Sequence, residues 1–505
     1  MAKGTRTGLG CVAVVLMLGL AQAAGAEEPK PVEKAPGAPT GPALAAAPPE
    51  AAPAAAPAAL GAPQAPVSAE PTQKKPVGPL DRVDDWFNKT KTIAPWLTWG
   101  ADLRFRSDYT NNNSGLDKRQ VGHETSQQKY RPRWWATVTP IKDIDLNVRI
   151  TWEGRHYSAP HGMPDFDHSS VLLDALNLKL TNIAGSPLSM TIGRQDIVLG
   201  DGWLVIDGTA IDGSRTTFFD AVRMSLDIEQ AQTLVEVIYV DNHYDSDRWW
   251  APPLHADHQA LMEQNERGLV LYLTNRSVKN TEINGYYMYK ESAFVVRGGD
   301  DGHIHTFGGR VAGDLSDRWK YRAEGAHQFG LRNDRYLRAF GFNSQLAYRV
   351  KDKWNHEVRG QYEFRSGDDP DTRTNEAFAP LWNRWDSWSQ VLASAFALET
   401  RKYEFTNLHR IGPGVTCKPT EKLELVGDYY LLFADENSMT GARNRRSFSA
   451  GGAFRGQMIQ TQVRYQFTKH LKGRILTEFF FPGNYYTDAR NDAATFLRGE
   501  LYFTW

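Results

Sequence analysis

Arginines recur at alternating positions along the chain, and this spacing is the feature with the clearest chemical meaning. In the segment 97–108, Arg104 and Arg106 alternate with Leu103 and Phe105. A strand here would place the arginines on one face and the apolar side chains on the other. A guanidinium keeps its charge at physiological pH, and its planar fork matches a carboxylate. If strands of this kind enclosed a water-filled lumen, arginines that face it would therefore favour the passage of anions.

Seven arginines lie near the middle of such segments and are the candidates for a constriction that contacts a permeating molecule. They are Arg104, Arg133, Arg149, Arg322, Arg359, Arg464 and Arg474. Acidic residues on the same faces, such as Glu363 and Asp428, could pair with them. Each arginine could therefore belong to a structural lattice of ion pairs instead. The excess of arginine over lysine on these faces favours an anionic permeant over a cationic one.

The elements that would position these arginines are β-strands. Apolar and polar residues alternate with a period of two from residue 96 onward, which predicts strands with one apolar face. In the last strand, Leu497 and Leu501 share one face, whereas Arg498 and Glu500 share the other. The sequence ends on the aromatic Trp505, as the closing strand of an outer-membrane barrel often does.

The connections between these strands come in two lengths that alternate along the chain. The short ones lie near Pro140, Gly185, Glu229, Ser277, Ser316, Asp352, Pro419 and Lys469. The longer, polar ones lie around Asn112, His161, Gly208, Pro252, Gly299, Asn333, Asp369, Gly441 and Tyr486. Nine hairpins with long tips predict an all-β fold, an 18-stranded antiparallel transmembrane β-barrel with short periplasmic turns and long extracellular loops.

The hydropathy of the chain agrees with this fold. Mean hydropathy is −0.50, and no segment after residue 26 approaches the ~20 apolar residues of a membrane-spanning helix. A barrel hides its apolar face by alternation, so it escapes this criterion. A soluble all-β binding protein is the alternative, but it predicts polar outer faces and irregular loop lengths.

The N-terminal part divides into two segments. Residues 1–26 have the pattern of a secretory signal peptide, with Lys3 and Arg6 before an apolar run and a small-residue cleavage site at its end. Residues 27–80 are rich in Pro and Ala, which predicts a disordered periplasmic tether. It could contact peptidoglycan or a periplasmic export partner. The barrel would occupy residues 96–505.

The longest connection, residues 366–402, is a candidate for a functional loop. Its segment 389–400 has a composition compatible with a helix. Long loops with their own secondary structure are often functional. The sequence leaves two alternatives open, an inward-folded constriction or lid and an external loop with one or two helical turns.

Other functional classes have little support. The chain has no Gly-x-Ser-x-Gly, His-Glu-x-x-His or Walker motif, so we expect no enzyme, no cofactor and no metal site. The pair His303 and His305 is only a weak metal candidate. Formal net charge is −1 without a basic cluster, which argues against nucleic-acid binding.

Two segments carry a resemblance that goes beyond alternation. Residues 190–205 read MTIGRQDIVLGDGWLV and lead to FDAVR at 219–223. Residues 365–370 read RSGDDP and lead to FAPL at 378–381. Both patterns resemble motifs of the alginate export family of outer-membrane porins, and the likeness covers most of residues 96–505.

The resemblance implies an 18-stranded barrel that lets a secreted anionic polyuronate, alginate, pass through an arginine-lined pore without a cofactor. The residues that match the motifs are Gly193, Arg194, Gln195, Gly200, Asp201, Gly202, Asp220, Arg223, Ser366, Gly367, Asp368 and Pro370. Arg194 could pair with Asp201, and Asp220 with Arg223. Expected partners are outer-membrane lipid and an anionic polysaccharide or small anions.

The chain departs from the family at Trp203, where an arginine is common. An aromatic ring here would suit stacking on a sugar as well as filling a gap. Gly200 and Gly202 would allow the preceding turn to adopt positive φ. Since the permeant of some family members is not obvious, the runner-up interpretation is a general or differently specific porin for small anions or oligosaccharides.

Overall fold

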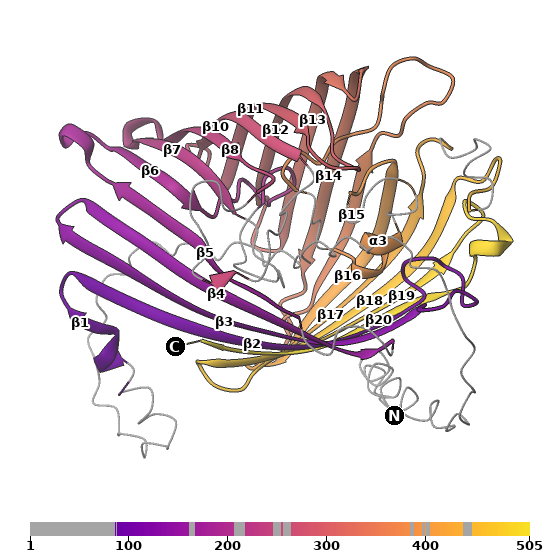
Figure 1. Cartoon of the computed structure of the whole chain (residues 1–505), viewed down its shortest axis with the longest axis horizontal. Helices are drawn as coiled ribbons and strands as arrows, with labels where there is room; N and C mark the ends of the chain where they lie inside the picture. The colour runs from indigo at the N-terminus through magenta and orange to yellow at the C-terminus, as the bar shows by residue number, and fades with distance from the viewer. Residues whose placement is uncertain are drawn as a thin grey trace, which may run out of the picture. The chain divides into compact units, whose positions relative to one another are not determined.

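The computed structural model describes the barrel and most of its connections (Figure 1). The described residues are 86, 88–160, 167–206, 218–245, 254–255, 264–383, 388–395, 399, 404–437 and 447–504. The predicted signal peptide, the predicted tether and Trp505 lie outside them. None of the helices in the described ranges is long and apolar enough to cross a membrane.

Eighteen long strands of the described chain form one antiparallel sheet that closes on itself. Their bounds are β2 (Leu97–Asn111), β3 (Glu124–Ile141), β4 (Ile144–Ala159), β5 (Asp167–Leu180), β6 (Leu188–Gln195), β7 (Phe219–Ile228), β8 (Thr233–Asn242), β10 (Gln264–Asn275), β11 (Thr281–Phe294), β12 (Gly302–Asp314), β13 (Trp319–Arg332), β14 (Arg335–Arg349), β15 (Glu357–Arg365), β16 (Leu408–Thr420), β17 (Leu423–Phe433), β18 (Phe454–Gln466), β19 (Leu471–Pro482) and β20 (Ala494–Thr504). The short strands β1 (Thr92–Ala94) and β9 (Leu254–His255) pair with β2 and β5.

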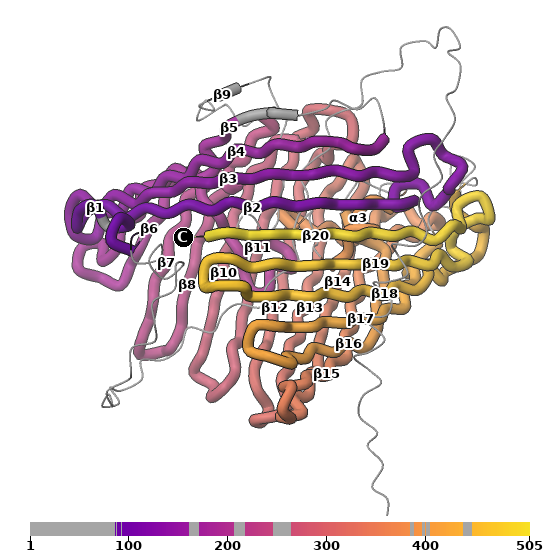
Figure 2. The backbone as a smooth tube through the Cα atoms, turned by 90° about the horizontal axis from the view of Figure 1, so that it is seen from below, coloured from indigo at the N-terminus to yellow at the C-terminus, as the bar shows by residue number. Residues whose placement is uncertain are grey.

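The first and last long strands close the barrel. β2 and β20 lie side by side and pair from Asp102 opposite Thr504 to Asn111 opposite Thr495 (Figure 2). The alternation has the predicted sense, since Leu103 on β2 is 46% exposed on the outer surface and Arg104 is 1% exposed inside. The predicted 18-stranded barrel is confirmed.

The turns agree with the prediction at one end of the barrel and depart from it at two described positions at the other. All eight predicted short connections are short. The connection around Gly299, residues 295–301, is no longer than the predicted short connections near Gly185 and Asp352. The expected longer loop around Asn333 is wrong, because β13 and β14 are joined by a two-residue hairpin, Asn333–Asp334, with φ of 51° and 65°. Both values suit a tight turn that matches the twist of its strands. The loops around His161, Gly208, Pro252 and Gly441 fall largely outside the described residues.

Inside the barrel, connections from the long-loop end pack against the wall as two apolar clusters. The first loop core joins segments 197–205 and 378–382 to the inner faces of β7–β14, through side chains such as Ile238, Val270 and Met288. The second loop core joins the helix α3 (Gln390–Ala395) and residues of three other connections to β16–β20. The loops thus fill much of the lumen.

Candidate functional site

The connection between β15 and β16 contributes to both loop cores. In its first half, Phe378 stacks on Trp203 with ring centroids 5.3 Å apart. Asn383 donates hydrogen bonds from Nδ2 to the carbonyl oxygens of Gly202 and Trp203, at 2.8 and 3.2 Å. The backbone N–H of Trp382 donates to the carbonyl of Leu204. These contacts bind the loop to the neighbouring connection between β6 and β7.

The second half of this connection is anchored to the opposite wall. All six residues of α3 are buried. Glu478 on β19 accepts hydrogen bonds from the backbone N–H groups of Gln390 and Val391 and from the hydroxyl of Ser389, at 2.9 to 3.0 Å. A buried carboxylate that accepts several donors holds the loop firmly in place. The described parts of the loop therefore follow the inward-folded alternative.

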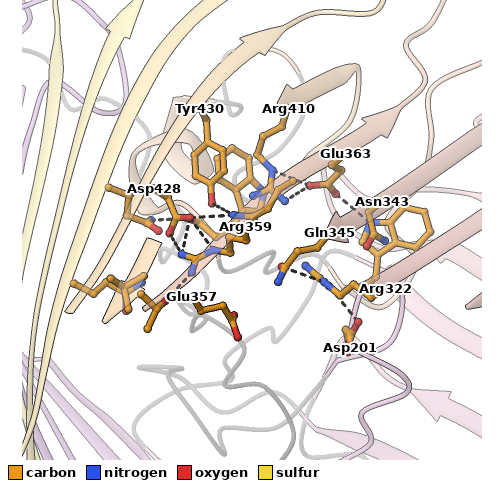
Figure 3. A pocket seen from close by; sticks show the side chains of 18 of the residues that line it. Asp201, Arg322, Asn343, Gln345, Glu357, Arg359, Glu363, Arg410, Asp428 and Tyr430 are labelled. Atoms are coloured by element: carbon orange, nitrogen blue, oxygen red, sulfur yellow. Dashed lines mark hydrogen bonds and ion pairs between the residues drawn. The ribbon is translucent and has the colours of Figure 1, made fainter. Parts of the chain in front are cut away.

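A cavity of about 320 Å³ lies where the two loop cores approach each other. Its wall comes from β13–β18, and its lining mixes charged, amide and aromatic side chains (Figure 3). The charged and amide residues are Arg322, Arg359, Arg410, Arg464, Asp201, Glu357, Glu363, Asp428, Asn343, Gln345, Gln361, Asn383, Gln460 and Gln462, and the aromatic residues are Trp203, Trp388 and Tyr430. Three of the seven predicted constriction arginines, Arg322, Arg359 and Arg464, thus meet at one site.

Each of these three arginines is paired. Arg359 donates from Nη2 to both carboxylate oxygens of Asp428, at 2.7 Å each. Arg322 Nη1 lies 3.1 Å from Asp201 Oδ2. Arg464 Nη1 lies 2.7 Å from Oε1 of Glu424. Burial tends to raise the pKa of Asp201, but hydrogen bonds from its arginine partners outweigh this and hold the pKa below its ordinary value.

Arg410 is a cavity residue that the sequence did not single out. Its guanidinium donates to Glu363 at 2.8 Å and lies over the rings of Trp388 and Tyr430, 4.4 and 4.9 Å from their centroids. Glycines and a proline interrupt the alternation on β16, which hid the pattern. The available signal was Ile411, an apolar residue that points outward and so places the adjacent Arg410 on the inner face.

Other predicted constriction arginines belong to a sealed wall, which we define as the inner face of β2, β3, β19 and β20. Arg133 donates to Asp102 with Nη2 at 2.6 Å, and Arg474 lies 3.5 Å from Glu500. Arg104 is 1% exposed. Charged side chains of the sealed wall include Asp102, Arg104, Arg106, Asp108, Lys129, Arg131, Arg133, Arg474, Arg498 and Glu500, and Glu478, the anchor of α3, lies on the same face of β19.

Arg149 on β4 lies outside both regions. Its guanidinium bridges Asp174 and Asp196 at 2.9 and 2.7 Å. The structure therefore distributes the seven candidate arginines over the cavity, the sealed wall and this bridge.

Comparison with known proteins identifies the family of this barrel. A model of the alginate export family matches residues 95–500. The chain belongs to the alginate export family. None of the curated proteins matches the sequence.

Solved structures with the same barrel agree. The chain is similar to Acinetobacter baumannii OccAB2, with 8% identity, a TM-score of 0.52 and coverage of 81% of this chain and 98% of that chain. It is also similar to Pseudomonas aeruginosa OccK3 (OpdO), with 11% identity, a TM-score of 0.51 and coverage of 83% and 98%. Identities this low show the shared fold alone. Family and fold together make this chain a porin-type export channel of the bacterial outer membrane.

The first motif that resembled the alginate export family builds the base of a loop. Gly193, Gly200 and Gly202 all have positive φ, as expected of the latter two. Gln195 donates from its amide to the carbonyls of Gly193 and Ala221, at 3.1 Å in both cases. These contacts hold the end of β6 against β7.

The expected ion pairs within this motif are wrong. Arg194 pairs with Asp220, not with Asp201, through two bonds of 2.9 and 3.0 Å. Arg223 pairs with Glu236 on the adjacent strand at 2.8 Å. The sheet holds the Cβ atoms of Arg194 and its cross-strand neighbour Asp220 close together. Asp220 and Arg223 lie three positions apart on β7, so their side chains point to opposite faces of the strand.

The motif's Asp201 reaches across the lumen to Arg310 as well as to Arg322, at 2.8 and 3.1 Å. Both arginines lie more than one hundred residues further along the chain. Trp203, the departure from the family, donates from its indole nitrogen to Glu363 at 3.1 Å. It is 7% exposed and fills a gap between the loops.

The second motif also supports a loop. The Ser366 hydroxyl accepts from the backbone of Phe340 and donates to the carbonyl of Glu376. Asp368 holds Arg335 with two bonds of 2.6 and 3.0 Å. A Cβ at Gly367 would lie 2.4 Å from a side-chain oxygen of Asn407. Pro370 follows at the loop tip. Within the described ranges, no three His, Cys, Asp or Glu side chains are grouped as metal ligands.

Proposed function

We propose that this outer-membrane channel exports an anionic polysaccharide, an alginate-like polyuronate, and that the permeating chain passes the cavity between the two loop cores. Family membership supports the substrate class. The site residues proposed for contact are Arg322, Arg359 and Arg464, joined by Arg410. Transport would be passive and driven by synthesis of the polymer upstream.

The relative exposure of the paired groups is the observation that carries the proposal. The side chain of Arg464 is 40% exposed and that of its partner Glu424 is 25% exposed. For Arg322 and Asp201 the values are 30% and 17%. In both pairs the guanidinium is the more exposed partner. A sugar carboxylate would therefore meet the arginine first and accept hydrogen bonds from it.

A second candidate is a general or differently specific porin for small anions or oligosaccharides. The balance of charge in the lining favours it, since Arg322, Arg359, Arg410 and Arg464 face four lining carboxylates. Such a lining gives weak selection by charge alone.

Single-channel recording of the refolded protein in a planar bilayer separates the two candidates. We expect an anion preference in a salt gradient and block of the current by polymannuronate. An anion-preferring channel that polymannuronate leaves unblocked would support the general porin. A folded protein without conductance would contradict both.

The N-terminal segments complete the proposal. We propose that residues 1–26 are removed on secretion and that residues 27–80 tether the barrel to peptidoglycan or to a periplasmic export partner. Deletion of residues 27–80 should leave conductance unchanged and abolish co-sedimentation with peptidoglycan. Unchanged co-sedimentation would contradict a peptidoglycan role and leave the export partner.

A further inference from the structure

The charges that line the cavity cancel. Four arginines and the carboxylates of Asp201, Glu357, Glu363 and Asp428 give a formal sum of zero, from 4 minus 4. Each arginine already has an acidic partner at 3.1 Å or less. A bound anion must therefore compete with a carboxylate that is already in place, so charge contributes little to net affinity.

Arg410 is an example of a lining charge whose interactions are already made within the protein. Its guanidinium is bound to Glu363 on one edge and lies over the rings of Trp388 and Tyr430. Cation–π contacts and a carboxylate partner satisfy a guanidinium on its faces and its edge together. Arg410 thus contributes to the shape of the cavity more than to its electrostatic potential.

Three buried polar atoms of lining residues have no hydrogen-bond partner within the described part of the chain. They are Nδ2 of Asn343, Oδ1 of Asn383 and the indole nitrogen Nε1 of Trp388. Asn343 is 7% and Asn383 is 4% exposed. The orientation of the Asn383 amide is set by the two bonds that its Nδ2 donates. A buried donor or acceptor without a partner costs about 1 to 3 kcal/mol, so these groups favour a molecule that satisfies them.

We propose that the cavity is a binding subsite for a hydroxyl-bearing sugar ring, uncharged rings included, and that the channel recognises its permeant through ring hydroxyls in addition to carboxylates. A hydroxyl both donates and accepts, so adjacent hydroxyls match the acceptor Oδ1 of Asn383 and, after small rotations of Asn343 and Trp388, the two donors. The amides of Gln345, Gln361 and Gln462 supply further partners. This inference rests on the proposed export of a polysaccharide. It extends the substrate class to neutral glycans.

The test compares two oligomers of one backbone. One is an oligomannuronate of defined length, and the other is the same oligomer with each carboxyl reduced to a hydroxymethyl group. Block of the single-channel current gives a dissociation constant for each. We expect the neutral oligomer to block the channel within about tenfold of the anionic one, because most of the contacts do not involve charge.

Two variants assign the block to the unpartnered groups. Trp388→Phe keeps an aromatic ring and removes the indole donor, and Asn343→Leu replaces an unpaired buried amide by an apolar group of similar size, which should not impair folding. Each should weaken block by the neutral oligomer about twofold to tenfold, the value of one hydrogen bond. Trp354→Phe, at a short turn outside the cavity, is the matched control and should have no effect.

The outcomes separate this inference from the proposed function. Block by the anionic oligomer alone would overturn the inference and leave polyuronate export intact. Absence of block by either oligomer would contradict the proposed function and the inference with it. Neutral block that both variants leave unchanged would overturn the assignment to Trp388 and Asn343. Neutral block that both variants weaken would support it.

Discussion

In the sealed wall of β2, β3, β19 and β20, arginines are covered from water, whereas two arginines of the cavity lined by β13–β18, Arg322 and Arg464, reach the lumen. Arg498 is fully buried against Asp108 at 2.7 Å. Arg464 on β18 is 40% exposed and equally close to its partner. Both arginines stand at inward positions of alternating strands, so the difference lies in what surrounds them.

The difference teaches that inward direction and contact with the permeant are separate properties. In the sealed wall, cations share their partners. Arg106 and Arg474 both pair with Glu500, and Lys129 and Arg498 both pair with Asp108. Such a network fixes the strands on either side of the barrel closure. In the cavity, the side chains of Arg322 and Arg464 are 30% and 40% exposed, whereas those of Arg359 and Arg410 are largely buried.

The largest expected effect follows from removal of a buried cation in the sealed wall. Arg498→Ala leaves the carboxylate of Asp108 buried with Lys129 as its remaining partner. Loss of one member of a buried pair costs about 3 to 5 kcal/mol. We expect a large drop in the urea midpoint, measured by the heat-modifiable mobility of the folded barrel on a gel. Arg464→Ala is the matched cavity variant and should lose at most about 1 kcal/mol. Equal losses in the two variants would remove the distinction between the regions.

A smaller and local effect is expected at the anchor of the inward loop. Glu478→Ala leaves the backbone N–H groups of Gln390 and Val391 and the Ser389 hydroxyl without their acceptor. Each unmet donor costs about 1 to 3 kcal/mol, and release of α3 avoids that cost. Single-channel conductance should therefore rise and become noisier while the barrel stays folded. Glu478→Gln retains one acceptor oxygen, so its conductance should lie between that of the wild type and that of Glu478→Ala. Unchanged conductance in Glu478→Ala would show that the loop does not narrow the pore.

Ion selectivity should distinguish the cavity from the sealed wall with a smaller loss of folding stability. Arg359→Ala exposes Asp428 to the cavity with Gln361 as its remaining donor. The reversal potential in a salt gradient should then shift toward cations. Because the pair is largely buried but Gln361 still donates to Asp428, stability should fall by about 3 kcal/mol. Arg133→Ala in the sealed wall should lower folding yield and leave selectivity unchanged in the pores that form. A selectivity shift in Arg133→Ala and none in Arg359→Ala would reverse our assignment.

The strands could be predicted because alternation is local, but the contacts between loops could not. Asn333 and Asp334 are polar, as long loop tips are, yet they form a tight hairpin since both tolerate positive φ. Parity placed Arg104 inside the barrel correctly. It could not reveal that Arg104 is covered, because burial depends on side chains brought together from distant strands.

The cavity illustrates the same limit. Asp201 pairs with Arg310 and Arg322, and Trp203 bonds to Glu363, across separations of 109 to 160 residues. No spacing along the chain encodes such pairs. The helical composition of segment 389–400 was a usable signal, since the described part of it forms α3.

The most direct test of the account is the affinity of polymannuronate for the open channel when the two exposed cavity arginines are removed. We would measure current block in the wild type, in the double variant Arg322→Ala/Arg464→Ala and in Arg349→Ala, whose arginine is 35% exposed and paired but lies outside the cavity lining. Hydrogen bonds to charged groups contribute about 1.5 to 3 kcal/mol each, and partial replacement by the sugar hydroxyl contacts should leave a loss of about tenfold in affinity. The account predicts that loss in the double variant and none in Arg349→Ala. Equal block in all three proteins would contradict the claim that the permeant passes the cavity between the loop cores.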